Sequence, residues 1–309
     1  MSVLIDPPLW PAHGTFFSHL VSDSSVDELH AFATEAGLPP GAFDRDHYDV
    51  PLREHERLVS LGAEPVSAGE LTRRLIRGGV RVPARERPDR HDAWLRRRFD
   101  ELLPGRSEVR EPLLARWSEP HRHYHDRRHL SEVLRSLDWL AAQELDQASH
   151  ASTRDTVLVA QLAGWWHDAV YQGVAGQDEQ ESAALARRDL AEPDADRAAG
   201  APSAAVVQRV SDAILMTVEH LPGGDPAQTL LNDADLRVLA RPEASYDRYV
   251  AQVRRDYAHV EDADFARGRA QVLRSLLGGE RLYVTQAGHQ AWEATARANL
   301  ERELRGLES

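Results

Sequence analysis

The spacing of hydrophobic and polar positions along the chain changes at about residue 86. The first part opens with a short β-prone run and continues through helical patterns that glycine and proline interrupt. The expected elements are a strand at 3–5, a helix at 26–36, a strand or turn at 44–51, and helices at 52–61 and 67–76. This pattern predicts a small α/β domain over residues 1–86.

Beyond a charged, proline-marked stretch near residues 85–88, nearly every segment shows helical spacing. The run TVLVAQLAGWW is apolar on almost every side, which predicts a helix in the middle of a bundle, with Ser152 and Asp155 capping its start. Other helices are expected at 130–141, 181–190, 204–217, 245–260, 266–277 and 287–304. With no alternating strand pattern and no fixed repeat, residues 87–309 are predicted to be all-α, and the protein mainly α.

Composition narrows the classes of partner. The 309 residues carry a formal net charge of -13, which argues against nucleic acid or an anionic membrane as the main partner. There is no cysteine, so thiolate chemistry is excluded. There is also no lysine, which excludes a lysine Schiff base and a Walker-type phosphate-binding loop. We find no secretory signal pattern and no apolar stretch of membrane-spanning length, and expect a cytoplasmic protein that binds a small molecule.

Histidines gather in the segment HRHYHDRRH, which holds four of the fifteen. His125 and His129 are spaced i, i+4, and His129 continues a stripe of apolar residues through Val133 and Leu137. The stripe predicts that the imidazole of His129 points into the core. A buried imidazole must be neutral and hydrogen-bonded, or bound to a metal ion.

Two further polar interruptions fall at the ends of apolar runs. His167 and Asp168 end the central run, where a divalent cation would compensate their burial. In LLNDADLRVLA, Asp233 or Asn232 can cap a helix at 236–240, which leaves Asp235 as the favoured ligand and the choice between the two aspartates open. The resulting donor set of two imidazoles and two carboxylates suits Mn, Fe, Zn, Ni, Co or Mg. Its members are His129, His167, Asp168 and Asp235.

This ordered set resembles the HD superfamily of metal-dependent phosphohydrolases. Over about residues 90–305 the chain is similar to one predicted HD phosphohydrolase subfamily. That subfamily usually has asparagine where this chain has Asp178. The matching motifs are RHYH, His129, WWHDAVY, DEQESA, Thr217-x-x-His220, DADL, Arg254-x-x-Tyr257, Gly268-Arg269 and Ala296-Arg297-x-Asn299-Leu300. The resemblance implies an all-helical HD-type domain and a hydrolase acting on the ester bond of a nucleotide or other phosphorylated small molecule.

The resemblance also implies roles for single residues. The four-residue donor set would bind one or two divalent ions, which activate water for attack on phosphorus. His125 would protonate the leaving oxygen, with Asp126 as its orienting group, and Glu179 would position water. His220 is a second-metal or substrate ligand, or a hydrogen-bonded core histidine. The phosphate-clamp candidates, for which ordinary ion pairs are the alternative, are Arg254, Arg269 and Arg297.

Other functions stay open at this stage. A di-iron oxygenase can use the same scaffold and ligands, and a non-catalytic, metal-stabilised binding or regulatory module can retain them without chemistry. Zincin peptidase chemistry is disfavoured because Asp126 stands where that motif needs glutamate. The sequence leaves the substrate, the identity and number of metal ions, and self-association undecided.

The first domain resembles, through VLIDPPLWPAHG, SHLVSD and HYDVP, a family catalogued only as a domain of unknown function. Several polar residues there could build a site of their own, and substrate selection or self-association are equally open roles. These residues are Asp6, His13, His19, Asp44, His47 and Asp49.

Overall fold

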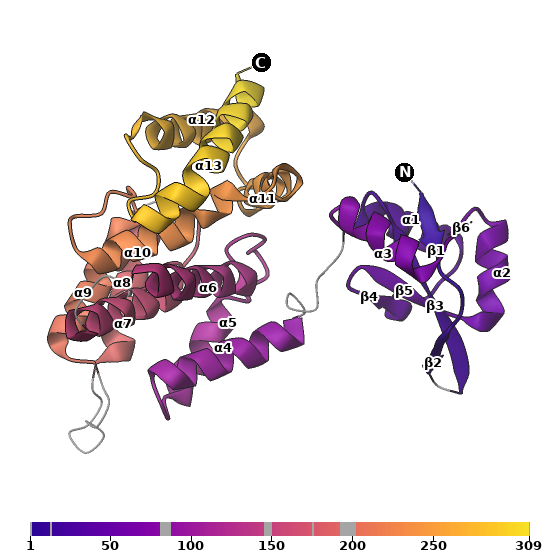
Figure 1. Ribbon diagram of the computed structural model, residues 1–309, viewed down its shortest axis with the longest axis horizontal. Helices are drawn as coiled ribbons and strands as arrows, with labels where there is room; N and C mark the ends of the chain where they lie inside the picture. The colour runs from indigo at the N-terminus through magenta and orange to yellow at the C-terminus, as the bar shows by residue number, and fades with distance from the viewer. Residues whose placement is uncertain are drawn as a thin grey trace. The chain divides into compact units, whose positions relative to one another are not determined.

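The computed structural model describes residues 2–12, 14–80, 88–144, 150–174, 176–191 and 202–308. His13, one of the polar residues noted above, lies outside them. The chain divides into two compact units, Met1–Arg87 and Pro88–Ser309, called here the N-terminal unit and the helical unit (Figure 1). The protein is mostly helical with a small N-terminal α/β part, as the hydrophobic pattern predicts.

The N-terminal unit is built on a sheet with strand order β4-β5-β3-β1-β6, and β2 pairs with β3. The strands are β1 (Val3–Ile5), β2 (Trp10–Ala12), β3 (Thr15–Ser22), β4 (Phe43–Asp44), β5 (His47–Pro51) and β6 (Glu64–Pro65). Strand β1 lies antiparallel to β3 and parallel to β6. The expected strand at 3–5 is confirmed, the segment 44–51 forms the hairpin β4–β5, and β3 was not anticipated.

Three helices and a short turn complete this unit: α1 (Val26–Glu35), η1 (Pro40–Ala42), α2 (Leu52–Ser60) and α3 (Ala68–Arg77). The three predicted helices are thereby confirmed. Ser25 and Ser67 cap α1 and α3 by accepting hydrogen bonds from Glu28 N and Glu70 N. Because side chains alternate along a strand, the sheet has two distinct faces. One packs Leu20, Tyr48 and Val50 against α1 and α2, and the other packs Leu4 and Val21 against α3.

In the helical unit, α7 packs against four other helices, α6, α8, α9 and α10, and is therefore central to the bundle. The elements are α4 (Pro88–Leu102), α5 (Ser107–Arg116), α6 (Arg127–Glu144), α7 (His150–Trp166), α8 (Gln177–Leu190), α9 (Ala204–Met216), α10 (Pro226–Asp235), η5 (Leu236–Ala240), α11 (Glu243–Asp256), α12 (Asp262–Gly278) and α13 (Gln286–Leu307). Trp165 and Trp166 of α7 are fully buried. This central position explains why the helix is apolar on all sides.

Two expected helix starts were wrong. Helix α7 begins at His150, so Ser152 lies inside it rather than before it. Helix α10 begins at Pro226, where the Asp225 carboxylate accepts a hydrogen bond from Ala227 N, and it continues to Asp235. Asp233 and Asp235 therefore occupy its last turn instead of capping residues 236–240, because the Asp-Pro pair starts the helix earlier.

Among the residues that the structure describes, no helix combines the length and apolar character needed to cross a bilayer.

Candidate metal centre

Four side chains from distant parts of the chain converge where α6 begins and where α7 and α10 end. His129 Nε2 lies 3.1 Å from His167 Nε2 and 3.1 Å from Asp235 Oδ1. Asp168 Oδ2 lies 3.3 Å from His167 Nε2 and 3.6 Å from His129 Nε2. The structure thus brings together all four members of the expected donor set. We call these four side chains the HD cluster, after the one-letter codes of histidine and aspartate.

The packing of α6 against α7 sets this convergence. A Cβ atom at Gly164 would lie 3.0 Å from Leu137 Cδ1, so the glycine allows the two helices to approach closely. The carbonyl of Gly164 also lies 3.0 Å from His167 Nδ1. Because a carbonyl only accepts, Nδ1 carries a proton, and Nε2 is the nitrogen that faces the cluster.

Burial and charge oppose each other in the HD cluster. The side chains of His129 and His167 are 3% and 0% exposed. Burial disfavours their charged forms, but the carboxylates of Asp168 and Asp235 outweigh it, so the pKa of both histidines is raised. Burial likewise opposes the charge on Asp168 and Asp235, yet the imidazoles hold both carboxyl pKa values below their usual range. Without a metal ion, the cluster therefore keeps protons on its histidines.

This protonation predicts how the metal-free protein responds to pH. Folding raises the pKa of both histidines, so their stabilising contribution is complete below the unfolded value of about 6.5 and is lost as pH rises through the higher folded values. In EDTA, the melting temperature of the helical unit should fall as the pH rises above about 6.5, and excess divalent ion should restore it at the alkaline end. A melting temperature that stays level in EDTA would contradict this assignment.

His125 lies beside the HD cluster rather than within it. It precedes α6, so the expected i, i+4 helical pair is wrong, although its ring centroid is 5.6 Å from that of His129. Its ring stacks on Tyr171, and its Nδ1 lies 2.8 Å from Asp256 Oδ2. Asp126, expected to orient His125, instead caps α6 by accepting a hydrogen bond from Arg128 N.

Asp256 is the residue that sequence reasoning missed. Its side chain is fully buried, and it accepts hydrogen bonds from the backbone N–H groups of His123 and Tyr124 as well as contacting His125. Burial opposes its charge, but these partners lower the pKa of its carboxyl. Asp256 lies between Arg254 and Tyr257 of a quoted motif, which was the only available signal.

Arg122 joins the histidine-rich segment to the end of α7. Its guanidinium is fully buried and donates hydrogen bonds to the carbonyl groups of His125, Asp168 and Ala169. These contacts fix the backbone on both sides of the HD cluster. Arg122 therefore positions the cluster and His125 together.

The acidic pair after the cluster stabilises local backbone. Asp178 accepts hydrogen bonds from Gln172 N, Gly173 N and Val174 N, which closes the turn that follows Asp168. Glu179 caps α8 by accepting a 2.6 Å hydrogen bond from Gly176 N. Burial raises the pKa of Glu179, and the charge of Asp168 adds to the effect. The charge of the HD cluster thus affects the pKa of Glu179, while the Glu179 carboxylate is hydrogen-bonded to the backbone at the start of α8.

His220 lies at the rim of the HD cluster. Its Nε2 is 3.8 Å from Asp235 Oδ2, and its Nδ1 is 3.3 Å from Asn232 Oδ1. Its backbone has φ 54°, a left-handed conformation that costs a non-glycine residue energy and recurs at functional sites. The histidine therefore extends the cluster by one nitrogen toward solvent.

The three arginines expected to clamp phosphate are held elsewhere. Arg254 donates to Asp262 and to the carbonyl of Tyr257. Arg269 forms a nearly buried ion pair with Glu303. Arg297 binds Glu293 and the carbonyl groups of Leu277 and Gly279. Each connects C-terminal helices or turns, and in the described residues none contacts the HD cluster, so we do not retain them as phosphate ligands.

Asp233 and Asp235 have different partners although they lie in one helical turn. Asp233 is buried and accepts hydrogen bonds from Val284 N, Thr285 N and Thr285 Oγ1 at 2.9, 2.8 and 2.6 Å. Asp235 faces the histidines. Within the expected set, Asp233 therefore joins α10 to the start of α13, and Asp235 belongs to the HD cluster.

Replacing Asp233 with asparagine should lower the unfolding free energy by about 1–3 kcal/mol and leave metal binding unchanged. An amide has one acceptor oxygen, and its NH2 group would face N–H donors that the second carboxylate oxygen satisfies. Urea unfolding followed by circular dichroism measures the change, with the exposed Asp155→Asn as the matched control. Equal midpoints for the two variants would show that the contact to Thr285 is unimportant.

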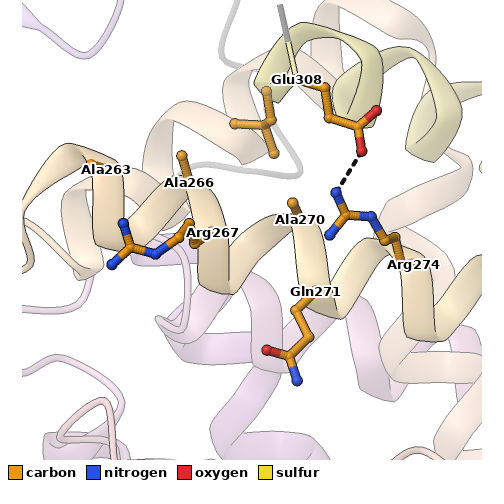
Figure 2. A pocket seen from close by; sticks show the side chains of 8 residues that line it. Ala263, Ala266, Arg267, Ala270, Gln271, Arg274 and Glu308 are labelled. Carbon is orange, nitrogen blue, oxygen red and sulfur yellow. Dashed lines mark hydrogen bonds and ion pairs between the residues drawn. The ribbon is translucent and has the colours of Figure 1, made fainter.

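A groove of about 620 Å³ lies away from these residues, along α12 and the end of α13 (Figure 2). The Arg274–Glu308 ion pair, at 2.6 Å, joins the two helices there. No member of the HD cluster lines it. The groove therefore takes no part in the candidate centre.

One family, described as a protein of unknown function (DUF4031), matches residues 3–78, which lie within the N-terminal unit. No curated protein and no solved structure matches the chain. The matched family carries no assigned chemistry.

Proposed function

We propose that the helical unit is an HD-type metal-dependent phosphohydrolase that cleaves a phosphoester of a nucleotide or another phosphorylated small molecule. The observation that carries the proposal is the convergence of the HD cluster, whose donor atoms come from α6, from the turn that follows α7 and from α10. Two imidazole nitrogens and two carboxylate oxygens suit a divalent ion such as Mn, Fe, Zn or Co. A bound divalent ion of this kind lowers the pKa of a coordinated water toward neutrality.

The chain supplies the other parts of the proposed chemistry. Asp168 and Asp235 balance the charge of the ion, and the Gly164 carbonyl fixes the ring of His167. Buried Trp117 and Tyr124 lie against the histidines, with the Trp117 ring 5.5 Å from that of His167. These apolar walls lower the local dielectric constant and strengthen the electrostatic interactions inside.

His125 is the proposed proton donor to the leaving oxygen. It is 18% exposed, so a substrate can reach it, and its ring lies close to the HD cluster. The Asp256 carboxylate, 2.8 Å from Nδ1, fixes the orientation of the ring. Asp256 is accordingly a positioning residue that acts through His125.

His220 Nε2, 3.8 Å from Asp235 Oδ2, offers a further ligand for a second ion, which both two-metal hydrolases and a di-iron oxygenase would use. The oxygenase is therefore the second candidate. It differs in its requirement for iron and oxygen, whereas the hydrolase releases phosphate without oxygen.

A metal-reconstitution assay tests the proposal. The full-length protein is stripped with chelator, reloaded separately with Mn, Mg, Fe(II), Co or Zn, and screened for phosphate release from nucleotides and sugar phosphates. We expect release that depends on the added ion and is independent of oxygen. Metal binding without release from any phosphoester would favour a binding module, and oxygen uptake by the iron-loaded protein would favour the oxygenase; either result overturns the hydrolase.

A further inference from the structure

The apolar cluster around α3 covers only part of one face of the sheet in the N-terminal unit. Strands β1 and β3 place Leu4 and Val21 against that helix. Two residues away from Val21 on the same face lies His19, which pairs across the sheet with Asp49 of β5. His47 stands two residues before Asp49 and therefore shares the face. Polar residues thus replace the apolar ones where the α3 cluster ends.

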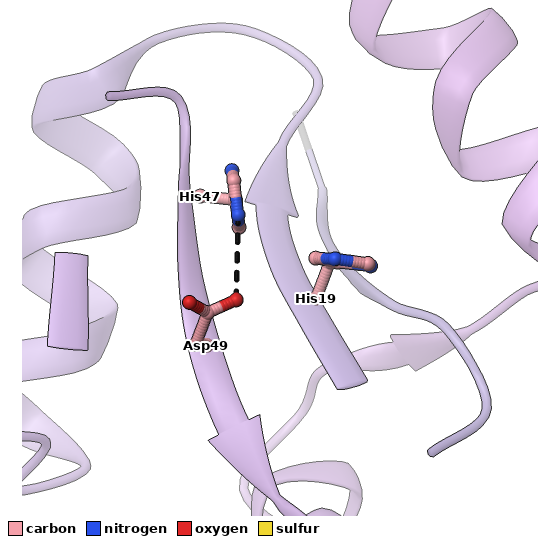
Figure 3. A group of neighbouring side chains, drawn as sticks. All are labelled: His19, His47 and Asp49. Carbon is pink, nitrogen blue, oxygen red and sulfur yellow. Dashed lines mark ion pairs between the residues drawn. The ribbon is translucent and has the colours of Figure 1, made fainter. Parts of the chain in front are cut away.

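These three side chains have the geometry of a metal site. One ligand atom from each of His19, His47 and Asp49 lies within 4.8 Å of the other two (Figure 3). His47 Nε2 is 3.4 Å from Asp49 Oδ1, and the two imidazole centroids are 4.9 Å apart. Cross-strand pairing of His19 with Asp49 and the i, i+2 spacing of His47 and Asp49 fix the backbone positions from which these side chains extend.

A buried carboxylate holds Nδ1 of each imidazole. Asp6 Oδ2 is 2.9 Å from His19 Nδ1, and Asp46 Oδ1 is 2.8 Å from His47 Nδ1. The Asp6 and Asp46 side chains are only 2% and 5% exposed. A carboxylate at Nδ1 selects the tautomer whose Nε2 lone pair can bind a metal, and it raises the basicity of that nitrogen. Carboxylate–histidine pairs of this kind commonly support metal ligands.

The local charge also favours a cation. With neutral imidazoles, Asp6, Asp46 and Asp49 place three negative charges around two rings. Asp49 is 48% exposed, so an ion bound there would keep positions open to solvent. Three protein ligands with open positions are typical of catalytic rather than structural zinc sites. Trp10, 53% exposed, contacts the ring of His19 and offers a flat apolar surface beside the opening.

We propose that His19, His47 and Asp49 bind a divalent transition-metal ion such as Zn²⁺ on the part of this sheet face beyond the α3 cluster, with the remaining positions open to water or a small oxyanion. The proposal is independent of the proposed phosphohydrolase, because it rests on residues of the N-terminal unit alone. It gives a binding site to a unit whose matched family has no assigned chemistry.

Cobalt(II) binding to the full-length chain tests the proposal. The background variant combines His167→Ala and Asp235→Asn, which removes two members of the HD cluster. After equilibrium dialysis against a modest excess of Co(II), we expect one ion per chain in this background and visible absorption from nitrogen and oxygen ligands. Adding His19→Ala or Asp49→Asn should weaken binding by more than about 100-fold, since loss of even a supporting partner typically costs about 10–100-fold.

His55→Ala in the same background is the matched control, because His55 lies on α2 outside the three-residue group. Circular dichroism checks folding, and Asp49→Asn keeps the side-chain shape at an exposed strand position. A background variant that binds no Co(II), or equal binding by the His19→Ala and His55→Ala chains, would overturn the proposal. If the HD cluster binds no metal but the N-terminal site does, the wild type and the background variant will each bind one Co(II) ion per chain. Failure of the proposed phosphohydrolase centre is therefore distinguishable from failure of the N-terminal site.

Discussion

Asp235→Asn should abolish tight divalent-metal binding in the helical unit and, with it, phosphate release, while the fold persists. The Asp235 carboxylate faces both histidines, at 3.1 Å from His129 Nε2 and 3.6 Å from His167 Nε2. Asparagine keeps the shape but removes the charge, and affinity should fall by more than about 100-fold, beyond the about 10–100-fold cost of losing a supporting partner. Metal analysis after dialysis and a phosphate-release assay measure both effects.

The chain offers a matched control two residues away. Asp233→Asn makes the same chemical change in the same helical turn, but its side chain faces Val284 and Thr285. We expect this variant to lose stability and keep its metal, and Asp235→Asn to lose its metal. Full metal content and full activity in Asp235→Asn would exclude Asp235 as a ligand.

His125→Ala should reduce the rate of phosphate release by about 10²–10⁴-fold, the usual contribution of a general acid or base, without loss of metal. His125 contacts Asp256 through Nδ1, and its ring lies beside that of His129 without entering the closest donor contacts. Steady-state kinetics with the best substrate of the screen, together with metal content, separates this effect from loss of a ligand. Metal loss that parallels the loss of rate would make His125 a ligand instead.

A double-mutant cycle extends this result to Asp256. If Asp256 acts by positioning His125, Asp256→Asn should slow the wild-type enzyme and add little once His125 is already alanine. A merely structural role would give additive losses in rate and equal losses in melting temperature in both backgrounds. Thermal melts of all four proteins accompany the kinetics.

Local patterns predicted most of the helical fold. Helices α1 and α3 follow serine caps, and α7 is recognisable because its apolar residues lie on all sides. Strand β3 was not predicted because Ser18 and Ser22, both fully buried, lie on the same face as Leu20. They interrupt the alternation of hydrophobic and polar residues that identifies a strand. A strand whose inner face carries small polar residues has no clear hydrophobic period.

The HD cluster could be anticipated because its members interrupt apolar runs, where burial of a polar group needs a partner. Which residue pairs with such a buried polar group depends on contacts between distant parts of the chain. Asp256 lies 131 residues from His125, and Thr285 lies 52 residues from Asp233. Neither spacing nor composition distinguishes such an aspartate from its many acidic neighbours. For the same reason the sequence could not decide between phosphate contacts and ion pairs for the three arginines, since their carboxylate and carbonyl partners are set by tertiary packing.

The most direct measurement is anomalous X-ray diffraction from crystals of the full-length protein, collected at the absorption edge of the metal that supports phosphate release. We predict a peak in the helical unit at coordinating distance, about 2.0–2.2 Å, from nitrogen atoms of His129 and His167 and oxygen atoms of Asp168 and Asp235. A fully active, metal-loaded crystal with no peak among these four side chains would contradict the proposed centre.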